Sequence, residues 1–176
     1  MHKLKGSFVA AFAVLMAACA ASGPKVRTDR DPTANLASYK TFAFYDQLLG
    51  DRARYSSVMS NRLRAATIAE LTKRGYTYDT RAPQLRVNLF LQVANRQDVR
   101  STPAMGLRPW IGRDIETVGY KAGTLRIDLV DVVRNSSVWQ GVAEGKIPEE
   151  ALNNPGPVID EVVRSIFRQF PDNIQT

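Results

Sequence analysis

The sequence predicts a single α+β domain in two layers: a mostly antiparallel sheet of about four to five strands, with two helices packed on one face. Two patterns lead to this fold class. Several segments alternate apolar and polar residues, as antiparallel strands do when one face lies in the core and the other in water. Two other segments repeat apolar residues every three or four positions, which is typical of helices that cover a sheet. The domain is expected at residues 26–172, a length that suits one core.

Two strands are expected near the start of this domain. Residues 26–31 favour a short strand that ends at Pro32, because proline cannot donate to a ladder. Residues 39–45 (YKTFAFY) are rich in aromatic residues and favour a second strand. Since side chains alternate along a strand, Phe42 and Phe44 should share one face.

The two helices are expected at residues 56–74 and 158–170. Ser56 is a suitable N-cap for the first helix, and Gly75 is suited to follow its last turn. The second helix should begin at Gly156-Pro157. Its apolar residues form one continuous stripe: Val158, Ile159, Val162, Val163, Ile166, Phe167 and Phe170.

Three further strands lie between these helices, at residues 84–95, 124–133 and 138–147, and the turn RNSS joins the last two in a hairpin. Strict alternation would place Asp131 on the apolar face, where a lone carboxylate is costly. We therefore expect a β-bulge near Val130 that turns Asp131 outward and brings Val130 and Val132 inward.

The N-terminal segment has the order of a signal peptide. Two lysines precede about ten apolar or small residues at 7–16, which are too few to span a bilayer. Two cleavage sites compete. Ala18-Cys19-Ala20 fits ordinary signal peptidase, whereas Met16-Ala17-Ala18-Cys19 resembles the lipobox of bacterial lipoproteins. Cys19 is the only cysteine and has no disulfide partner, which favours its lipidation.

We thus expect a signal peptide at residues 1–18, and a lipidated Cys19 and tether at residues 19–25. Two or more acyl chains anchor a protein stably to a membrane. Ala20 follows the cysteine, which resembles enteric lipoproteins exported to the outer membrane. The expected location is therefore the inner leaflet of the outer membrane, facing the periplasm.

Composition excludes several chemistries from the mature chain. Loss of the signal peptide removes His2, the only histidine, so neither a Ser-His-Asp or Cys-His catalytic site nor a His or Cys zinc site is expected. The formal charge falls from +7 to +5, because 22 basic residues remain against 17 acidic ones. No base-stacking RNA-binding signature accompanies this charge. We expect no cofactor, no metal and no nucleic-acid partner, and instead a lipid headgroup, a wall polymer or an envelope protein.

Several motifs together resemble the lipoproteins of the family called domain of unknown function 4136. The most specific are GTLRIDLVD at residues 123–131 and WQG at residues 139–141. Others are YKTF at 39–42, Gly75-Tyr76 and the C-terminal Phe170-Pro171. The resemblance implies a small bacterial envelope lipoprotein, and it implies no catalytic residue.

The expected function is thus that of a non-enzymatic, outer-membrane-anchored lipoprotein that binds another envelope component. The alternative is a carboxylate-dependent enzyme acting on a wall or lipid polymer, for which Asp128, Asp131 and Glu144 are the exposed acids to consider. Residues 96–123 are rich in arginine, glycine and proline, and are expected to be a long irregular segment. That segment is either a partner contact or a basic loop without a specific role. As a contact it would use Arg108, Trp110 and Arg113.

Overall fold

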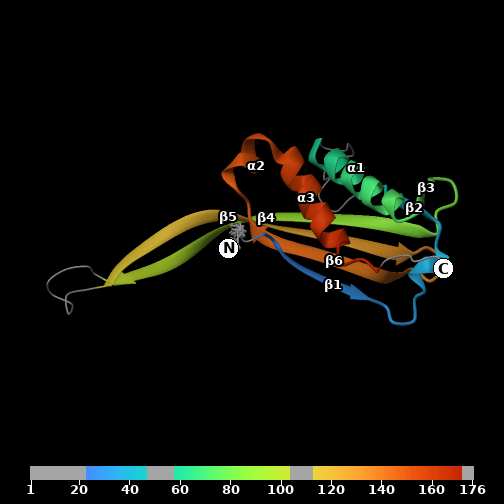
Figure 1. Ribbon diagram of the computed structural model, residues 1–176, viewed down its shortest axis with the longest axis horizontal. Coiled ribbons are helices and arrows are strands. Elements are labelled where there is room, and N and C mark those ends of the chain that lie inside the picture. The colour runs from blue at the N-terminus through green and yellow to red at the C-terminus, as the bar shows by residue number, and fades with distance from the viewer. Residues whose placement is uncertain (1–22, 47–57, 104–112, 172–176) are drawn as a thin grey trace, which may run out of the picture.

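The computed structural model describes residues 23–46, 58–103 and 113–171, and within them it shows a six-stranded mixed sheet with helices on one face (Figure 1). The strand order is β1-β6-β5-β4-β2-β3. The elements follow one another as β1 (Lys25–Arg30), the 3-10 helix η1 (Leu36–Ser38), β2 (Thr41–Phe44), α1 (Val58–Lys73), β3 (Thr77–Tyr78), β4 (Leu85–Pro103), β5 (Arg113–Asp131), β6 (Ser136–Lys146), α2 (Glu149–Asn153) and α3 (Pro155–Phe167).

This architecture confirms the predicted two-layer α+β class. The pairs β1–β6, β6–β5 and β5–β4 are antiparallel, whereas β2 runs parallel to both β4 and β3. The parallel pair follows from the connection, since β2 returns to the sheet through α1. The short β3 and α2, which have too few residues for a periodic pattern, were not expected from the sequence.

Helix α3 lies directly on β6, and aromatic side chains fill the contact between them. The Trp139 ring stacks on Phe167 at a centroid distance of 5.4 Å and meets Phe170 edge-on at 4.9 Å. A side chain at Gly141 would collide with Ile166, and it would lie 2.6 Å from Trp139 Cη2. The absence of a Cβ at Gly141 therefore lets the helix approach the strand this closely.

Helix α1 covers the neighbouring part of the sheet and is tied to α3 through Arg74. Arg74 donates to the backbone oxygen of Phe167 at 2.6 Å and to Glu70 Oε2 at 2.8 Å. Gly75 follows the helix with φ +85°, a conformation that favours glycine, so the predicted C-terminal stop is confirmed. The expected N-cap, Ser56, lies outside the described residues.

The expected bulge is present, but its effect on Asp131 differs from the prediction. The register of β5 and β6 shifts between Leu129 and Val130, and the extra residue is Val138 on β6. Asp131 stays 7% exposed, and Val132 is 43% exposed. The outward rotation was wrong because Asp131 is not a lone buried carboxylate.

Asp131 joins the β5–β6 turn to the segment before β2. Its Oδ2 accepts from the Tyr39 hydroxyl at 2.7 Å and from Arg134 Nε at 3.0 Å. Its Oδ1 accepts from the backbone N–H groups of Val133 and Arg134, each at 2.8 Å. The Tyr39 hydroxyl and these other donors hold the pKa of the Asp131 carboxyl well below its usual range.

Strands β4 and β5 pair continuously from Leu85–Asp131 to Pro103–Arg113, whereas β6 leaves the sheet after pairing with Ala122. Residues 95–103 and 113–121 consequently form a two-stranded ribbon that projects from the body, and we call it the arm (Figure 1). The expectation that residues 96–123 are irregular was wrong for the described part of that segment. Both faces of a ribbon meet water, so its sequence lacks the alternation that marks a half-buried strand.

Truncation of Phe167 should destabilise the domain. Phe167→Ala removes a fully buried ring from the contact of α3 with β6 and should lower the free energy of unfolding by about 3–5 kcal/mol. Val133→Ala, at a side chain that is 93% exposed, is the control and should change it by less than about 0.5 kcal/mol. Denaturant melts check both. Equal midpoints for Phe167→Ala and the parent would contradict the docked helix.

Acid should weaken the Asp131 contacts. Because the pKa of this carboxyl is lower in the folded chain than its unfolded value of about 4, its contribution is present above that pH and is lost as the pH falls further. Asp131→Asn should therefore be less stable at pH 7 and lose less stability than the parent on acidification. Other carboxyls whose pKa is lowered, such as that of Glu70, also make stability depend on pH, so part of this dependence remains in the variant. Denaturant melts between pH 7 and pH 2 measure it, and an unchanged slope would refute this role.

Candidate functional site

The face of the sheet opposite the helices carries polar and charged side chains, and we call it the open face. The register places alternate residues of β1, β6, β5 and β4 on it, because the intervening residues form the core. Its members in the body include Asn88, Phe90, Gln92, Thr124, Arg126, Asp128, Gln140 and Glu144. The prediction that the sheet is open on one side is therefore confirmed.

Asp128 forms the centre of a hydrogen-bonded row across three strands of this face. Its Oδ1 accepts from Gln140 Nε2 at 2.8 Å, and its Oδ2 accepts from Asn88 Nδ2 at 3.2 Å. Arg126 Nε lies 3.2 Å from the same Oδ2, and its guanidinium stands over the Phe90 ring at 5.2 Å. With the Asp128 residue only 7% exposed, this row is a fixed polar surface.

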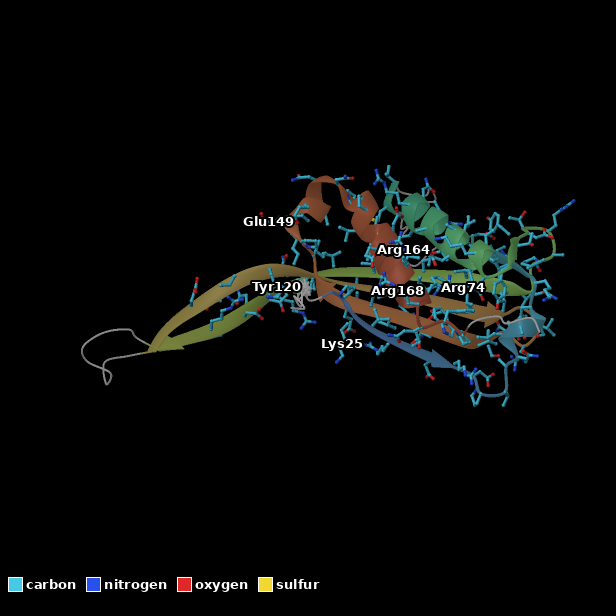
Figure 2. All side chains as sticks on the ribbon, viewed as in Figure 1. Lys25, Arg74, Tyr120, Glu149, Arg164 and Arg168 are labelled. Atoms are coloured by element: carbon cyan, nitrogen blue, oxygen red, sulfur yellow. The ribbon has the colours of Figure 1, made fainter. Side chains whose placement is uncertain are left out.

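A second cluster lies where the arm leaves the body, and we call it the arm-root patch. It consists of Lys25, Arg27, Arg96, Asp98, Arg100, Glu144 and Lys146. Arg27 pairs with Glu144 at 3.0 Å, and Lys146 pairs with Asp98 at 2.7 Å. These cations hold the pKa values of the two carboxyls below their usual range. Figure 2 shows Lys25 and Tyr120 at the base of the arm, away from Arg164 and Arg168 on the helical layer.

The cation Lys146 also connects the body to the arm. Its Nζ stands 4.1 Å from the centroid of the Tyr120 ring while it pairs with Asp98. Lys146 belongs to β6, whereas Tyr120 and Asp98 belong to the two strands of the arm. The last residue of β6 thus steadies the base of the arm.

The opposite face of β4 carries exposed apolar side chains. Leu91, Val93 and Val99 are 36%, 54% and 68% exposed, and they continue the row whose earlier members, such as Leu89, are buried under the helices. This row of apolar side chains therefore leads from the body to Val99 in the arm, whose other face carries charged side chains.

The carboxylates named for an enzyme do not form a common site. Asp128 and Asp131 are each 7% exposed, so the expectation that they are exposed was wrong. Asp128 belongs to the row on the open face, Asp131 to the β5–β6 turn, and Glu144 to the arm-root patch. Each one already accepts from its own cations or hydrogen-bond donors.

The remaining predicted site residues are placed only in part. Arg113 begins β5 opposite Pro103, at the outer end of the described arm. Cys19, Arg108 and Trp110 lie outside the described residues, so the lipidation and the partner contact stay predictions. Sequence reasoning missed the arm, although the β-favouring run Thr117, Val118 and Tyr120 was a signal for it.

Across residues 23–46, 58–103 and 113–171, no three carboxylate, histidine or cysteine side chains come together as a metal site would need. Over those same ranges, no helix has the length and apolar character needed to cross a bilayer.

Two solved structures with a TM-score above 0.5 show the fold. A DUF4136 family protein from Bacteroides thetaiotaomicron matches with a TM-score of 0.57 at 15% identity, covering 86% of this chain and 97% of that one. A PDZ domain protein from Parabacteroides distasonis matches with the same TM-score at 16% identity, over 83% of this chain. This chain spans 35% of that protein's length. A minor lipoprotein from Acinetobacter baumannii has a TM-score of 0.43 at 12% identity, covering 74% of this chain and 91% of that one.

Comparisons of sequence show the family. No curated protein matches the chain. The family described as domain of unknown function (DUF4136) matches residues 26–172, which is the whole of the expected domain. The chain therefore belongs to the DUF4136 family.

Proposed function

We propose that this chain is a non-enzymatic lipoprotein of the bacterial cell envelope, anchored in the outer membrane and facing the periplasm, whose arm binds another envelope component. The arm is the observation that carries the proposal. A two-stranded ribbon is marginally stable in water on its own, and this one leaves both of its edges unpaired by other strands in the described part of the chain. Such an element gains stability when a partner covers it.

The anchor is supported by the N-terminal sequence and by the place where the domain begins. The lone Cys19 follows an apolar segment of signal-peptide length, and β1 begins only a few residues later at Lys25. A short tether of this kind suits a lipid anchor, because the domain then stays beside the membrane.

A binding role is favoured over the enzyme by the state of the carboxylates. Glycoside hydrolysis needs two carboxyl groups about 5–10 Å apart, on either side of one bond. Asp128 and Asp131 lie in separate hydrogen-bonded groups, and Glu144 is paired with Arg27.

Lipidation is tested by mass. The protein purified from membranes should begin at Cys19 and carry the mass of a diacylglycerol thioether plus an amide-linked acyl chain. Cys19→Ala should release the domain into the soluble fraction or leave its precursor uncleaved. A wild-type chain that begins at Ala21 without acyl groups would overturn the anchor.

The contact is tested by photo-crosslinking in intact cells. A photoreactive amino acid at Val99, exposed on the arm, should give crosslinks to a discrete envelope component. The matched control is Val133, which is exposed at the β5–β6 turn beyond the opposite end of the sheet. Crosslinks from Val133 alone, or none from either position, would contradict a partner on the arm.

A further inference from the structure

We propose that the arm-root patch binds the phosphate groups of an anionic phospholipid membrane, so that the open face at the base of the arm lies against the bilayer. This proposal rests on the proposed anchor at Cys19. The patch gives the anchored domain one orientation on the membrane.

The first argument is position. Cys19 and Lys25 are six positions apart, and a chain of that length reaches about 20 Å at full extension. The chain enters β1 beside β6, since a Cβ added to Gly145 would lie 3.2 Å from Pro24 Cα. Lys25 is itself a member of the patch, opposite Glu144. An acylated Cys19 would therefore hold Lys25, at the near end of the patch, within about 20 Å of the lipid headgroups.

The second argument is charge. The patch contains five cations and two carboxylates, and Glu116 lies opposite Arg100 on the same face, so the net charge there is +2. Lys25 and Arg96 both act on Glu144 in addition to its partner Arg27, and Arg100 acts on Asp98 in addition to Lys146. The cations thus outnumber the carboxylates that they surround. Such clusters are attracted to anionic leaflets, and the attraction decays within about 8–10 Å at physiological salt.

The third argument is that the charge lies on one side. At the same level, the helical side of the molecule carries Glu149 and Glu150 on α2, together with Lys121 on the arm. Arg164 on α3 and Arg168 just after it are both paired with Glu161. At the level of the arm root, an anionic surface is therefore attracted to the open face and not to α2.

The experiment measures where the anchored domain lies on a vesicle. Full-length acylated protein is reconstituted into vesicles of phosphatidylcholine, with or without phosphatidylglycerol. Its own cysteine carries lipid, so a fluorophore can be placed on a new cysteine, either Thr124→Cys on the open face or Asp160→Cys on α3. Energy transfer to a headgroup-labelled lipid reports the distance of each label from the bilayer.

We expect phosphatidylglycerol to raise the transfer from position 124 and not from position 160. Molar NaCl should return it to the level seen with phosphatidylcholine alone, because salt screens exposed charges. The pair Lys25→Glu and Arg96→Glu should abolish the rise, whereas Arg164→Glu with Arg168→Glu, the matched control, should leave it unchanged. Circular dichroism checks that each variant is folded.

Two outcomes would overturn the proposal: equal transfer from position 124 in both kinds of vesicle, or a rise that persists in the Lys25→Glu, Arg96→Glu variant. Inorganic phosphate is compared with NaCl at equal ionic strength. If phosphate abolishes the rise and NaCl does not, the patch is a site for the free ion. Crosslinks from the patch to a protein, without any rise, would assign the patch to that protein.

Failure of the anchor is recognised separately. An unacylated chain does not float with neutral vesicles, and this result alone would overturn the proposed lipidation. The same chain then tests the patch, because it should float with phosphatidylglycerol vesicles at low salt and not at molar NaCl. If it stays in solution with both kinds of vesicle, the patch does not bind the membrane.

Discussion

The close packing of α3 on β6 is the contact on which the rest of the domain depends. Gly141 leaves room for Ile166, and the rings of Trp139, Phe167 and Phe170 fill the space beside it. Arg74 then links this contact to α1 through the backbone oxygen of Phe167. Because both helices are held on one side, the other side of the sheet stays open to solvent. The fixed helical layer thus determines which side chains are available for binding.

Two carboxylates of the body, Asp131 and Asp128, have different structural roles. Asp131 holds the β5–β6 turn against Tyr39, which precedes β2, and thereby joins segments far apart in the sequence. Asp128 orders the side chains of Asn88 and Gln140 on the open face. Both acids are held in position by the donors from which they accept. They favour a rigid surface over a pair of groups that exchange protons.

The arm differs physically from the body that supports it. In the body, each strand of the pair β4 and β5 has one face under the helices, so burial of residues such as Leu89 and Ile127 stabilises the pairing. In the arm, that burial is lost while the backbone pairing continues to Pro103 and Arg113. Both faces of the arm then meet water. A ribbon of this kind presents its faces and edges for the binding that we propose.

The sequence by itself determined the α+β class, the two main helices and the strands that have one buried face. In these elements the spacing of apolar residues along the sequence matches the residues that are buried. Examples are the alternation that begins at Leu85 and the helical stripe that ends at Phe170. It also determined the bulge near Val130 and the family, through motifs such as GTLRIDLVD. Only the tertiary structure decided that Asp131 is buried and hydrogen-bonded, because its partner Tyr39 lies 92 positions away in the sequence. Only the tertiary structure decided the arm and the arm-root patch. A ribbon exposed to water on both faces has no burial period, and the patch gathers charges from three strands, β1, β4 and β6.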